Sequence, residues 1–333
     1  MSPRREAMMN HRATARASPE CGPTNPSSWV IVWAGGQGER LNPFIQHWLG
    51  ESRPKQYCRF VGRRTMLEHT WARAQSLAPG GQILTVAAPE HRFLLSGLDV
   101  TGEILYQPRP CGTAPGVFLP LTAIAAADPH ALIHLMPSDH FIYPRERFVR
   151  HLALTETIVR AAPDRLVLTA AVPDIAEKDF GWIQPGRAVT GAGWAALTVT
   201  AFHEKPDAAQ AVRYLKAGYL WNTMIVSCTV ATLWGIASRL PTMLSRFNAV
   251  REAWSTPTRE AAIRDAYAGM PTFDFSRDLL EKSTAECLLL PLSGIAWSDW
   301  GRPNRITASV AEYGLQPNYP YHAATPELTR LAS

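Results

Sequence analysis

The stretch "WVIVWAGGQGERLNPF" occupies residues 29–44, and "PKQY" follows it at residues 54–57. Its first residues are bulky and apolar, a pattern typical of a buried strand. Gly35, Gly36 and Gly38 come directly after this run. Where a parallel strand ends in a glycine loop, backbone N–H groups lie at the carboxyl edge of the sheet and can approach an anion closely. The stretch therefore favours an anion site at the end of the first strand.

Two common phosphate-binding motifs do not fit this loop. GxxxxGK[ST] is absent, and Leu41 occupies the position of the third glycine of GxGxxG. A glycine-rich turn without further context is most often only a turn, and a single arginine such as Arg40 is usually an exposed surface charge. The loop alone therefore does not distinguish an anion site from a simple turn, and other segments of the sequence are needed.

Downstream, apolar runs alternate with helical patterns. The periodicity predicts strands at 29–34, 82–88, 131–137, 165–172, 196–206, 219–228 and 287–301. It predicts helices between them at 65–77, 114–127, 207–218 and 274–282, and helical segments over 229–267 that are broken near Pro241 and Pro257. Pro120 is expected in or near the first turn of the helix at 114–127. This alternation predicts an α/β fold with a mainly parallel, mixed sheet flanked by helices.

The composition excludes several classes of protein. The chain has 333 residues, 46% hydrophobic and 18% charged, and lacks an apolar run long enough to span a membrane. Its five cysteines form no CxxC pair, which is typical of a protein of the reducing cytoplasm. A net charge of +5 is too small to indicate a nucleic-acid surface. Residues 1–28 lack apolar periodicity and predict a disordered extension rather than a secretory signal.

The opening motif has a wider context. The pattern "GGxGxRLxP…PKQ" resembles that of the sugar-1-phosphate nucleotidyltransferases, above all the mannose-1-phosphate guanylyltransferases. Further segments resemble motifs of that family in the same order: "QPRPCGTAPG" (107–116), "MPSDHFI" (136–142), "FHEKPD" (202–207), "WNTMIV" (221–226) and "WSDWG" (297–301). Six matches in register over residues 29–303 favour the family over an accidental turn. The resemblance implies a Rossmann-like nucleotidyltransferase fold.

The resemblance also implies roles for individual residues. It assigns the nucleotide to a set of loop residues: Gly35, Gly36, Gly38, Gln107, Gly112 and Thr113. It assigns the catalytic cations to Arg40 and Lys55 on the triphosphate and Lys205 near the sugar phosphate. Sugar contacts fall to Gly181 in "DFGWI", Glu204 and Asn222. The metal falls to Asp139 and Asp299, whose hard carboxylates suit Mg²⁺ together with phosphate oxygens and water.

Each assignment has a simpler alternative. Asp139 or Asp299 taken alone is more often a turn or cap residue. Glu204 and Lys205 could form an exposed ion pair, and as neighbours in a strand they should face opposite sides. His140 is a softer ligand than Mg²⁺ prefers, so packing or orienting the loop is its expected role.

The chain departs from the family pattern at several positions. Gly112 stands where Asn is usual, which should leave the loop freer to move, and Gly116 replaces an alanine. The expected reaction joins GTP and mannose 1-phosphate to give GDP-mannose and pyrophosphate. The alternatives are glucose 1-phosphate with UTP, dTTP or ATP, a silent regulatory paralogue, and a glycosyltransferase, for which a DxD motif is missing.

The resemblance also predicts the domain organisation. Residues 29–305 should form one catalytic domain and residues 306–333 a short tail, too short for a β-helix or an isomerase domain. The expected partners are the two substrates, without nucleic acid or membrane. The oligomeric state stays open, and a homo-oligomer is one of the options.

Overall fold

The computed structural model describes residues 27–320, and the expectations for residues 1–26 and 321–333 lie outside this part. Within it, nine strands form one sheet in the order β3-β2-β1-β4-β9-β6-β10-β8-β7, and β5 and β11 pair separately. The strands have these bounds: β1 Ser28–Ala34, β2 Ile83–Ala87, β3 Glu103–Tyr106, β4 Leu132–Pro137, β5 Phe141–Tyr143, β6 Leu166–Ala171, β7 Gly181–Gly191, β8 Trp194–Glu204, β9 Leu220–Thr229, β10 Cys287–Pro291 and β11 Ala296–Ser298.

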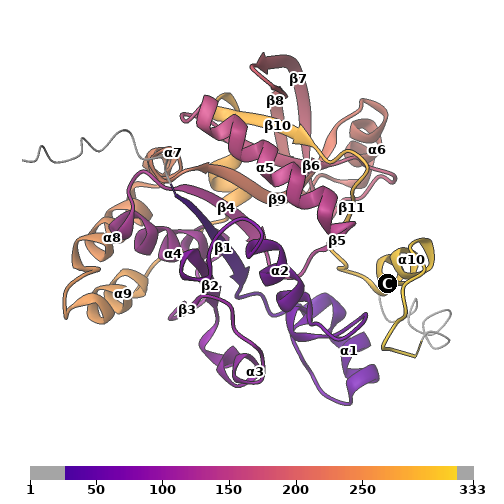
Figure 1. Ribbon diagram of the computed structural model, residues 1–333, viewed down its shortest axis with the longest axis horizontal. Helices are drawn as coiled ribbons and strands as arrows, with labels where there is room; N and C mark the ends of the chain where they lie inside the picture. The colour runs from indigo at the N-terminus through magenta and orange to yellow at the C-terminus, as the bar shows by residue number, and fades with distance from the viewer. Residues whose placement is uncertain (1–26, 321–333) are drawn as a thin grey trace, which may run out of the picture.

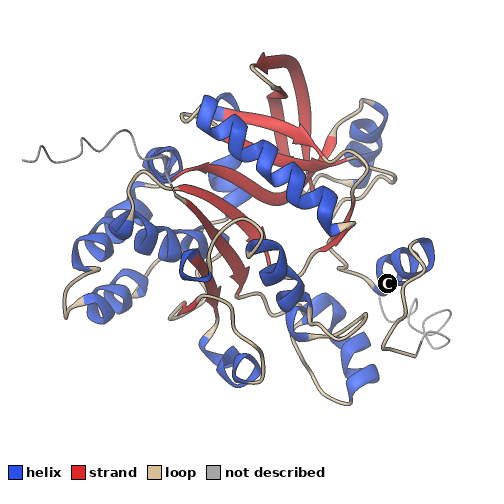
Figure 2. Ribbon diagram, in the orientation of Figure 1, coloured by secondary structure: helices blue, strands red, loops and turns tan. Residues whose placement is uncertain are grey.

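Helices cover both faces of this sheet (Figures 1 and 2). Their bounds are α1 Asn42–Leu49, α2 Met66–Ala74, α3 Arg92–Ser96, α4 Thr113–Ala127, α5 Arg145–Ala161, α6 Ala208–Lys216, α7 Val230–Ile236, α8 Pro241–Ala253, α9 Arg259–Tyr267 and α10 Pro303–Glu312, with a short π-helix at Phe275–Leu280. The prediction of an α/β fold is confirmed. In the described part of the chain, no helix is both long and apolar enough to cross a membrane.

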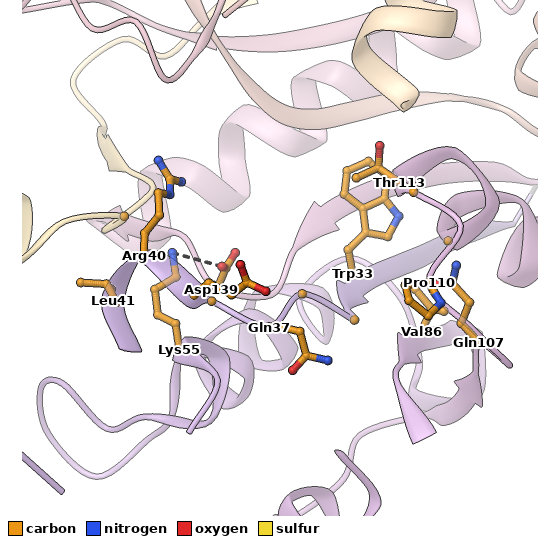
Figure 3. A pocket seen from close by; sticks show the side chains of 17 residues that line it. Trp33, Gln37, Arg40, Leu41, Lys55, Val86, Gln107, Pro110, Thr113 and Asp139 are labelled. Carbon is orange, nitrogen blue, oxygen red and sulfur yellow. Dashed lines mark ion pairs between the residues drawn. The ribbon is translucent and has the colours of Figure 1, made fainter. Parts of the chain in front are cut away.

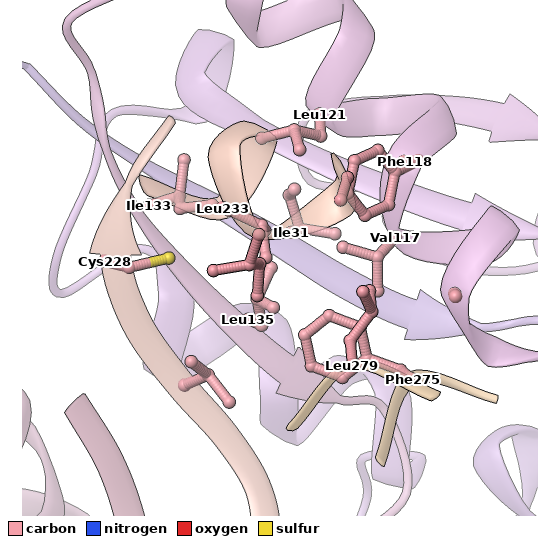
Figure 4. Packing of buried hydrophobic residues seen from close by; sticks show 14 of the residues in the cluster. Ile31, Val117, Phe118, Leu121, Ile133, Leu135, Cys228, Leu233, Phe275 and Leu279 are labelled. Atoms are coloured by element: carbon pink, nitrogen blue, oxygen red, sulfur yellow. The ribbon is translucent and has the colours of Figure 1, made fainter. Parts of the chain in front are cut away.

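Strand β1 lies between β2 and β4 and is parallel to both. Its side chains alternate between two cores, because successive strand residues face opposite sides. Ile31 packs with Val117, Phe118 and the other residues of one core, seen in Figure 4. Val30 and Val32 pack on the other face with the core that includes Trp71 of α2. Burial on both faces explains the continuous apolar run that ends in the glycine loop.

Antiparallel pairing begins at β9, which lies between β4 and β6 and runs antiparallel to both. Strands β7 and β8 form a long hairpin at the far edge. The second half of the chain thereby brings the start of β7, the end of β8 and the start of β9 to the same edge as the end of β1. This arrangement places segments from both halves of the sequence around one site.

Two details of the predicted elements were wrong. Pro120 lies in the middle of α4 rather than in its first turn. A proline inside a helix costs about 3 kcal/mol, and burial of apolar neighbours such as Val117 and Leu121, at about 1.5–3 kcal/mol each, outweighs that cost. The segment predicted as one strand at 287–301 forms β10 and β11, because Gly294, at φ 64°, lies in the turn between them.

The structure also extends beyond the catalytic domain that the sequence predicted at residues 29–305. Ser28 belongs to β1, and the Ser27 carbonyl accepts a hydrogen bond from the Leu132 N–H at 2.9 Å. Helix α10 runs across residue 305, and its buried Ile306 packs in the cluster that contains Leu41. Residues on both sides of each predicted boundary are therefore part of the fold.

Candidate active site

A large cavity opens at the carboxyl end of β1 and has a volume of about 610 Å³. Figure 3 shows Arg40, Lys55 and Asp139 gathered at one end, and Val86, Gln107 and Pro110 at the other. One end is therefore charged and the other is mostly apolar. Such a division suits a ligand with an anionic part and a flat, weakly polar part.

The glycine loop is held against the "PKQY" segment. Gly38 adopts a left-handed conformation, with φ 66° and ψ 30°, and a Cβ added there would lie 3.0 Å from the Lys55 backbone nitrogen. The Gln56 amide donates to the carbonyl oxygens of Ala34, at 3.0 Å, and Gly36, at 2.7 Å. These contacts explain why the two motifs occur together although α1 separates them. They also fix the backbone that lines the cavity.

Lys55 connects three distant segments. Its side chain is buried, and its Nζ lies 3.1 Å from Asp139 Oδ2. The same ammonium donates to the backbone carbonyl of Asp299. One buried cation therefore contacts both Asp139, at its carboxylate, and Asp299, at its backbone carbonyl, although 160 positions of sequence separate residues 139 and 299.

A second cavity, of about 190 Å³, adjoins the first. Arg40 and Thr113 line both cavities, so the two form one continuous site. All the residues that the sequence assigned to the site line one or the other: Gly35, Gly36, Gly38, Arg40, Lys55, Gln107, Gly112, Thr113 and Asp139 in the first, and Arg40, Thr113, Gly181, Lys205, Glu204, Asn222 and Asp299 in the second.

Glu204 and Lys205 line the same cavity, so the expectation that they face opposite sides was wrong. Lys205 has a φ of 47°, in the left-handed region, which ends the alternation of the strand directly after Glu204. The Lys205 ammonium lies 3.4 Å from Glu204 Oε1. Burial is the main reason that the pKa of Glu204 is raised, and it outweighs the lowering by Lys205.

Gly181 leaves room for the two polar side chains beside it. A Cβ at this position would lie 2.7 Å from Glu204 Oε2 and 3.2 Å from the Asn222 Cβ. The side-chain Oδ1 of Asn222 accepts a hydrogen bond from the Met224 N–H at 3.0 Å, and its Nδ2 donates to the Ser276 hydroxyl at 3.4 Å. The second cavity thus contains a carboxylate, an amide and an ammonium, which are suitable groups for hydroxyls and a phosphate.

A network of arginines that the sequence did not predict surrounds Asp299. Arg305 of α10 bonds Asp299 Oδ1 at 2.6 Å, and Arg40 lies 3.2 Å from Asp299 Oδ2. Asp179 pairs with Arg40 at 3.2 Å and with Arg302 at 2.8 Å. Burial alone would raise the pKa of Asp299, but Lys55, Arg305 and hydrogen bonds hold this pKa below its usual range. Arg302 and Arg305 lie far from Asp179 in the sequence and outside every motif quoted above, so the sequence contained no pattern that predicts this network.

His140 has the orienting position that the sequence favoured. Its Nδ1 accepts a hydrogen bond from the Trp297 indole N–H at 3.1 Å, and the two rings meet edge to face. Burial lowers the pKa of His140 to about 4, so the ring is neutral at pH 7. The contact joins the loop after β4, which contains Asp139, to β11, which ends directly before Asp299.

The expectation that Gly112 makes its loop freer to move was wrong. Gly112 has a φ of 87°, and a Cβ added there would lie 2.2 Å from the Phe273 carbonyl oxygen. That carbonyl accepts from the Ala114 N–H at 3.1 Å, and the Thr113 hydroxyl accepts from the Phe275 N–H at 2.7 Å. The segment around residue 273 takes the space where a side chain would lie, so the loop is fixed by packing.

Gly112→Ala is therefore expected to damage both the loop and the cavity. The left-handed backbone and the clash with Phe273 should cost about 2 kcal/mol or more. We expect a lower Tm in thermal unfolding and at least a tenfold rise in the KM for nucleoside triphosphate. Gly235→Ala in α7 is the matched control, because an added Cβ there meets nothing within 4 Å. A Gly112→Ala protein as stable and active as the control would contradict this account of the loop.

Residues 29–313 match the nucleotidyl transferase family, and the chain belongs to that family. Xanthan biosynthesis protein XanB of Xanthomonas campestris pv. campestris is 32% identical over 286 residues, covering 81% of this chain and 57% of that protein. A mannose-1-phosphate guanylyltransferase of Escherichia coli is 29% identical over 279 residues, again covering 81% and 57%. The chain therefore spans a little over half the length of these curated relatives.

Solved structures agree with the family. A crystal structure described as a mannose-1-phosphate geranyltransferase from Thermus thermophilus has a TM-score of 0.71 and 25% sequence identity, covering 84% of this chain and 79% of that one. A structure described as a mannose-6-phosphate isomerase from Helicobacter pylori has a TM-score of 0.62 at 19% identity, covering 82% of this chain and 99% of that one, which supports the fold alone.

Proposed function

We propose that this protein transfers a guanylyl group from GTP to mannose 1-phosphate, forming GDP-mannose and releasing pyrophosphate. The observation that carries the proposal is the pair of adjoining cavities, which Arg40 and Thr113 both line and beside which Lys55 is buried. The larger cavity suits a nucleoside triphosphate, and the smaller one suits a sugar phosphate. The choice of mannose and guanine is supported by relatives such as the Escherichia coli mannose-1-phosphate guanylyltransferase.

The reaction requires the protein to neutralise phosphate charge and to align the two substrates. A phosphate oxygen of the sugar 1-phosphate attacks the α-phosphorus of the triphosphate, and the bond to pyrophosphate breaks in line. The attacking oxygen is ionised at pH 7, so the step needs no general base. Two unit negative charges about 4 Å apart repel by about 4 kcal/mol at an effective dielectric constant of 20. Arg40 and Lys55 at the triphosphate and Lys205 at the sugar phosphate would offset this repulsion.

We also propose that Asp139 and Asp299 hold Mg²⁺. In the described residues, no group of three or more His, Cys, Asp or Glu side chains could hold a metal alone. Two carboxylates fit Mg²⁺ nonetheless, since this ion commonly takes one or two carboxylates and completes its shell with phosphate oxygens and water. When bound, the ion would neutralise phosphate charge. Asp299 Oδ2 would have to exchange its contact with Arg40 for the ion, and Arg40 would then keep Asp179 as a partner and have its second guanidinium nitrogen available for phosphate.

A grid of pyrophosphate-release assays tests the proposal, with four nucleoside triphosphates against mannose 1-phosphate and glucose 1-phosphate. We expect kcat/KM for GTP at least tenfold above that for ATP and UTP, and mannose 1-phosphate ahead of glucose 1-phosphate. A site built to bond one sugar hydroxyl rejects the epimer, because its own polar groups are then left unpaired. A preference for UTP, dTTP, ATP or glucose 1-phosphate would refute the guanylyltransferase assignment, and no turnover at all would favour a silent paralogue.

Lys205→Ala is expected to affect the sugar side of the reaction alone. Lys205 lines the smaller cavity, whereas Arg40 lines both. We expect the KM for sugar phosphate to rise about tenfold and the KM for triphosphate to stay within about twofold, since one charge-assisted contact is lost. Steady-state kinetics with each substrate varied in turn measures this, with Lys216→Ala in α6 as an exposed control. A rise confined to the triphosphate KM would contradict the division between the cavities.

A further inference from the structure

The two carboxylate oxygens of Asp299 have different neighbours. Oδ1 accepts hydrogen bonds from Arg305 Nη1 at 2.6 Å and from the Gly301 N–H at 2.9 Å. Oδ2 lies 3.2 Å from Arg40 Nη2, and Arg40 lines both cavities. Two hydrogen bonds of good length, one of them from a charged donor, fix the carboxylate at Oδ1. The position of Oδ2 beside Arg40 is therefore fixed as well.

The Arg305 guanidinium is held from several sides. Its side chain is only 11% exposed, and it bonds Glu177 as well as Asp299. Its guanidinium carbon lies 4.6 Å from the centroid of the Phe180 ring, and Phe180 lines the smaller cavity. A planar guanidinium with donors in a fixed fork can hold two carboxylates in one geometry, which a single ammonium does less well. Arg305 therefore connects Asp299 to the wall of the smaller cavity.

Helix α10, which carries Arg305, is fixed to the turn that contains Asp299. Trp300 has a φ of 43°, a left-handed conformation that costs about 1–3 kcal/mol and persists only where the surrounding structure enforces it. Its buried ring stacks on Phe141 at 4.6 Å, and its indole N–H donates to the Ser309 hydroxyl at 3.1 Å. The Ser309 hydroxyl in turn donates to the Arg305 carbonyl at 2.9 Å. These contacts fix the backbone of Arg305 relative to the backbone of Asp299.

We propose that Arg305 is a positioning residue, which orients Asp299 so that Oδ2 is available to Mg²⁺. The inference rests on the proposed function, in which Asp299 is a ligand of that ion. Hydrogen-bond partners of a ligating carboxylate orient it, and loss of such a partner typically lowers metal affinity about 10- to 100-fold. The charge of Arg305 acts in the opposite direction, because a cation beside the site repels a second cation. Positioning thus predicts weaker metal binding after removal of Arg305, whereas a purely electrostatic role predicts tighter binding.

The test measures Mn²⁺ binding by the full chain, since Mn²⁺ accepts the same oxygen ligands as Mg²⁺. The protein is saturated with the α,β-methylene analogue of GTP, or of the triphosphate that the wild type prefers, because the methylene bridge prevents turnover. Electron paramagnetic resonance reports free Mn²⁺, and binding by the analogue alone is subtracted. We expect Arg305→Met to raise the Mn²⁺ dissociation constant about tenfold. Arg305→Lys keeps the charge but loses the fork, so it should raise the constant by about threefold.

Arg246→Met in α8 is the matched control for a loss of stability. The Arg246 guanidinium donates to the carbonyl oxygens of Ala266 at 2.9 Å and Ala268 at 2.6 Å, and Arg246 lines neither cavity. This variant should lower the Tm as Arg305→Met does. It should leave the Mn²⁺ dissociation constant within about twofold of the wild-type value, because distant sites act independently.

An unchanged or lower Mn²⁺ dissociation constant in either Arg305 variant would overturn the inference. Arg305→Lys provides this comparison even where Arg305→Met fails to fold, because it keeps a cation beside Glu177 and Asp299. A wild type that binds no Mn²⁺ beyond the analogue would overturn the metal assignment and this inference together. The grid of triphosphates and sugars is measured on the wild type alone, so a different substrate preference would refute the guanylyltransferase assignment and leave the role of Arg305 standing.

Discussion

Asp299→Asn and Asp139→Asn are each expected to lower kcat at least 100-fold, because each removes a charged ligand from the proposed metal site. Their effects on stability should differ. Asp299 is buried and accepts bonds from Arg305 at 2.6 Å and from the Gly301 N–H at 2.9 Å. The Asp139 side chain is 31% exposed and pairs with Lys55 alone among lysines and arginines of the described part. The Asp299 variant should therefore show the larger fall in Tm, and the Asp139 variant a smaller one from the lost partner of the buried Lys55.

The pH dependence of this difference follows from the pKa of Asp299, which is lowered in the folded protein. A carboxylate with a lowered pKa contributes stability above its unfolded pKa, about 3.9, and loses it as the pH falls through the lower folded value. The gap in Tm between the wild type and Asp299→Asn should thus be full at pH 6 and shrink below pH 4. Turnover assays with Mg²⁺ and thermal unfolding over this pH range measure both effects. Near-wild-type turnover of either variant would rule out that residue as a ligand.

Lys55→Met should be the most damaging single change among the cations, with a loss in kcat/KM of at least 100-fold. Methionine has a similar length and keeps the burial but removes the charge that lies between Asp139 and the Asp299 carbonyl. Loss of one preorganised donor at developing charge typically costs about 100- to 1000-fold. The loss should appear in kcat as well as in KM, since the cation acts on phosphate charge during the transfer.

Two companion variants sharpen the test of Lys55. Lys216→Met makes the same chemical change on exposed α6 and should leave activity within about twofold. Lys55→Arg keeps the charge and should recover part of the kcat if charge is the property that matters. A Lys55→Met protein with an unchanged kcat and a raised KM alone would show that the lysine binds the nucleotide but takes no part in the transfer.

Local pattern was enough to predict much of the molecule. The apolar run of β1 predicted a strand buried on both faces, and Asp207 and Gly218 marked the ends of α6, whose capping box the structure contains. These features depend on residues a few positions apart, for which sequence spacing and spatial contact are nearly equivalent. The short motifs also marked most of the segments that line the two cavities, because each motif is a strand end or loop that is itself continuous in sequence.

What the sequence by itself determined was therefore the order of the elements and the identity of the loops at the sheet edge. Only the tertiary structure decided how these loops face one another. It placed Lys55 between the Asp139 carboxylate and the Asp299 carbonyl, set Arg305 of α10 against Asp299, and packed Phe273 against Gly112. The physical reason is that electrostatic contact and steric exclusion depend on distances of a few ångströms between segments that the pairing order of the sheet brings together.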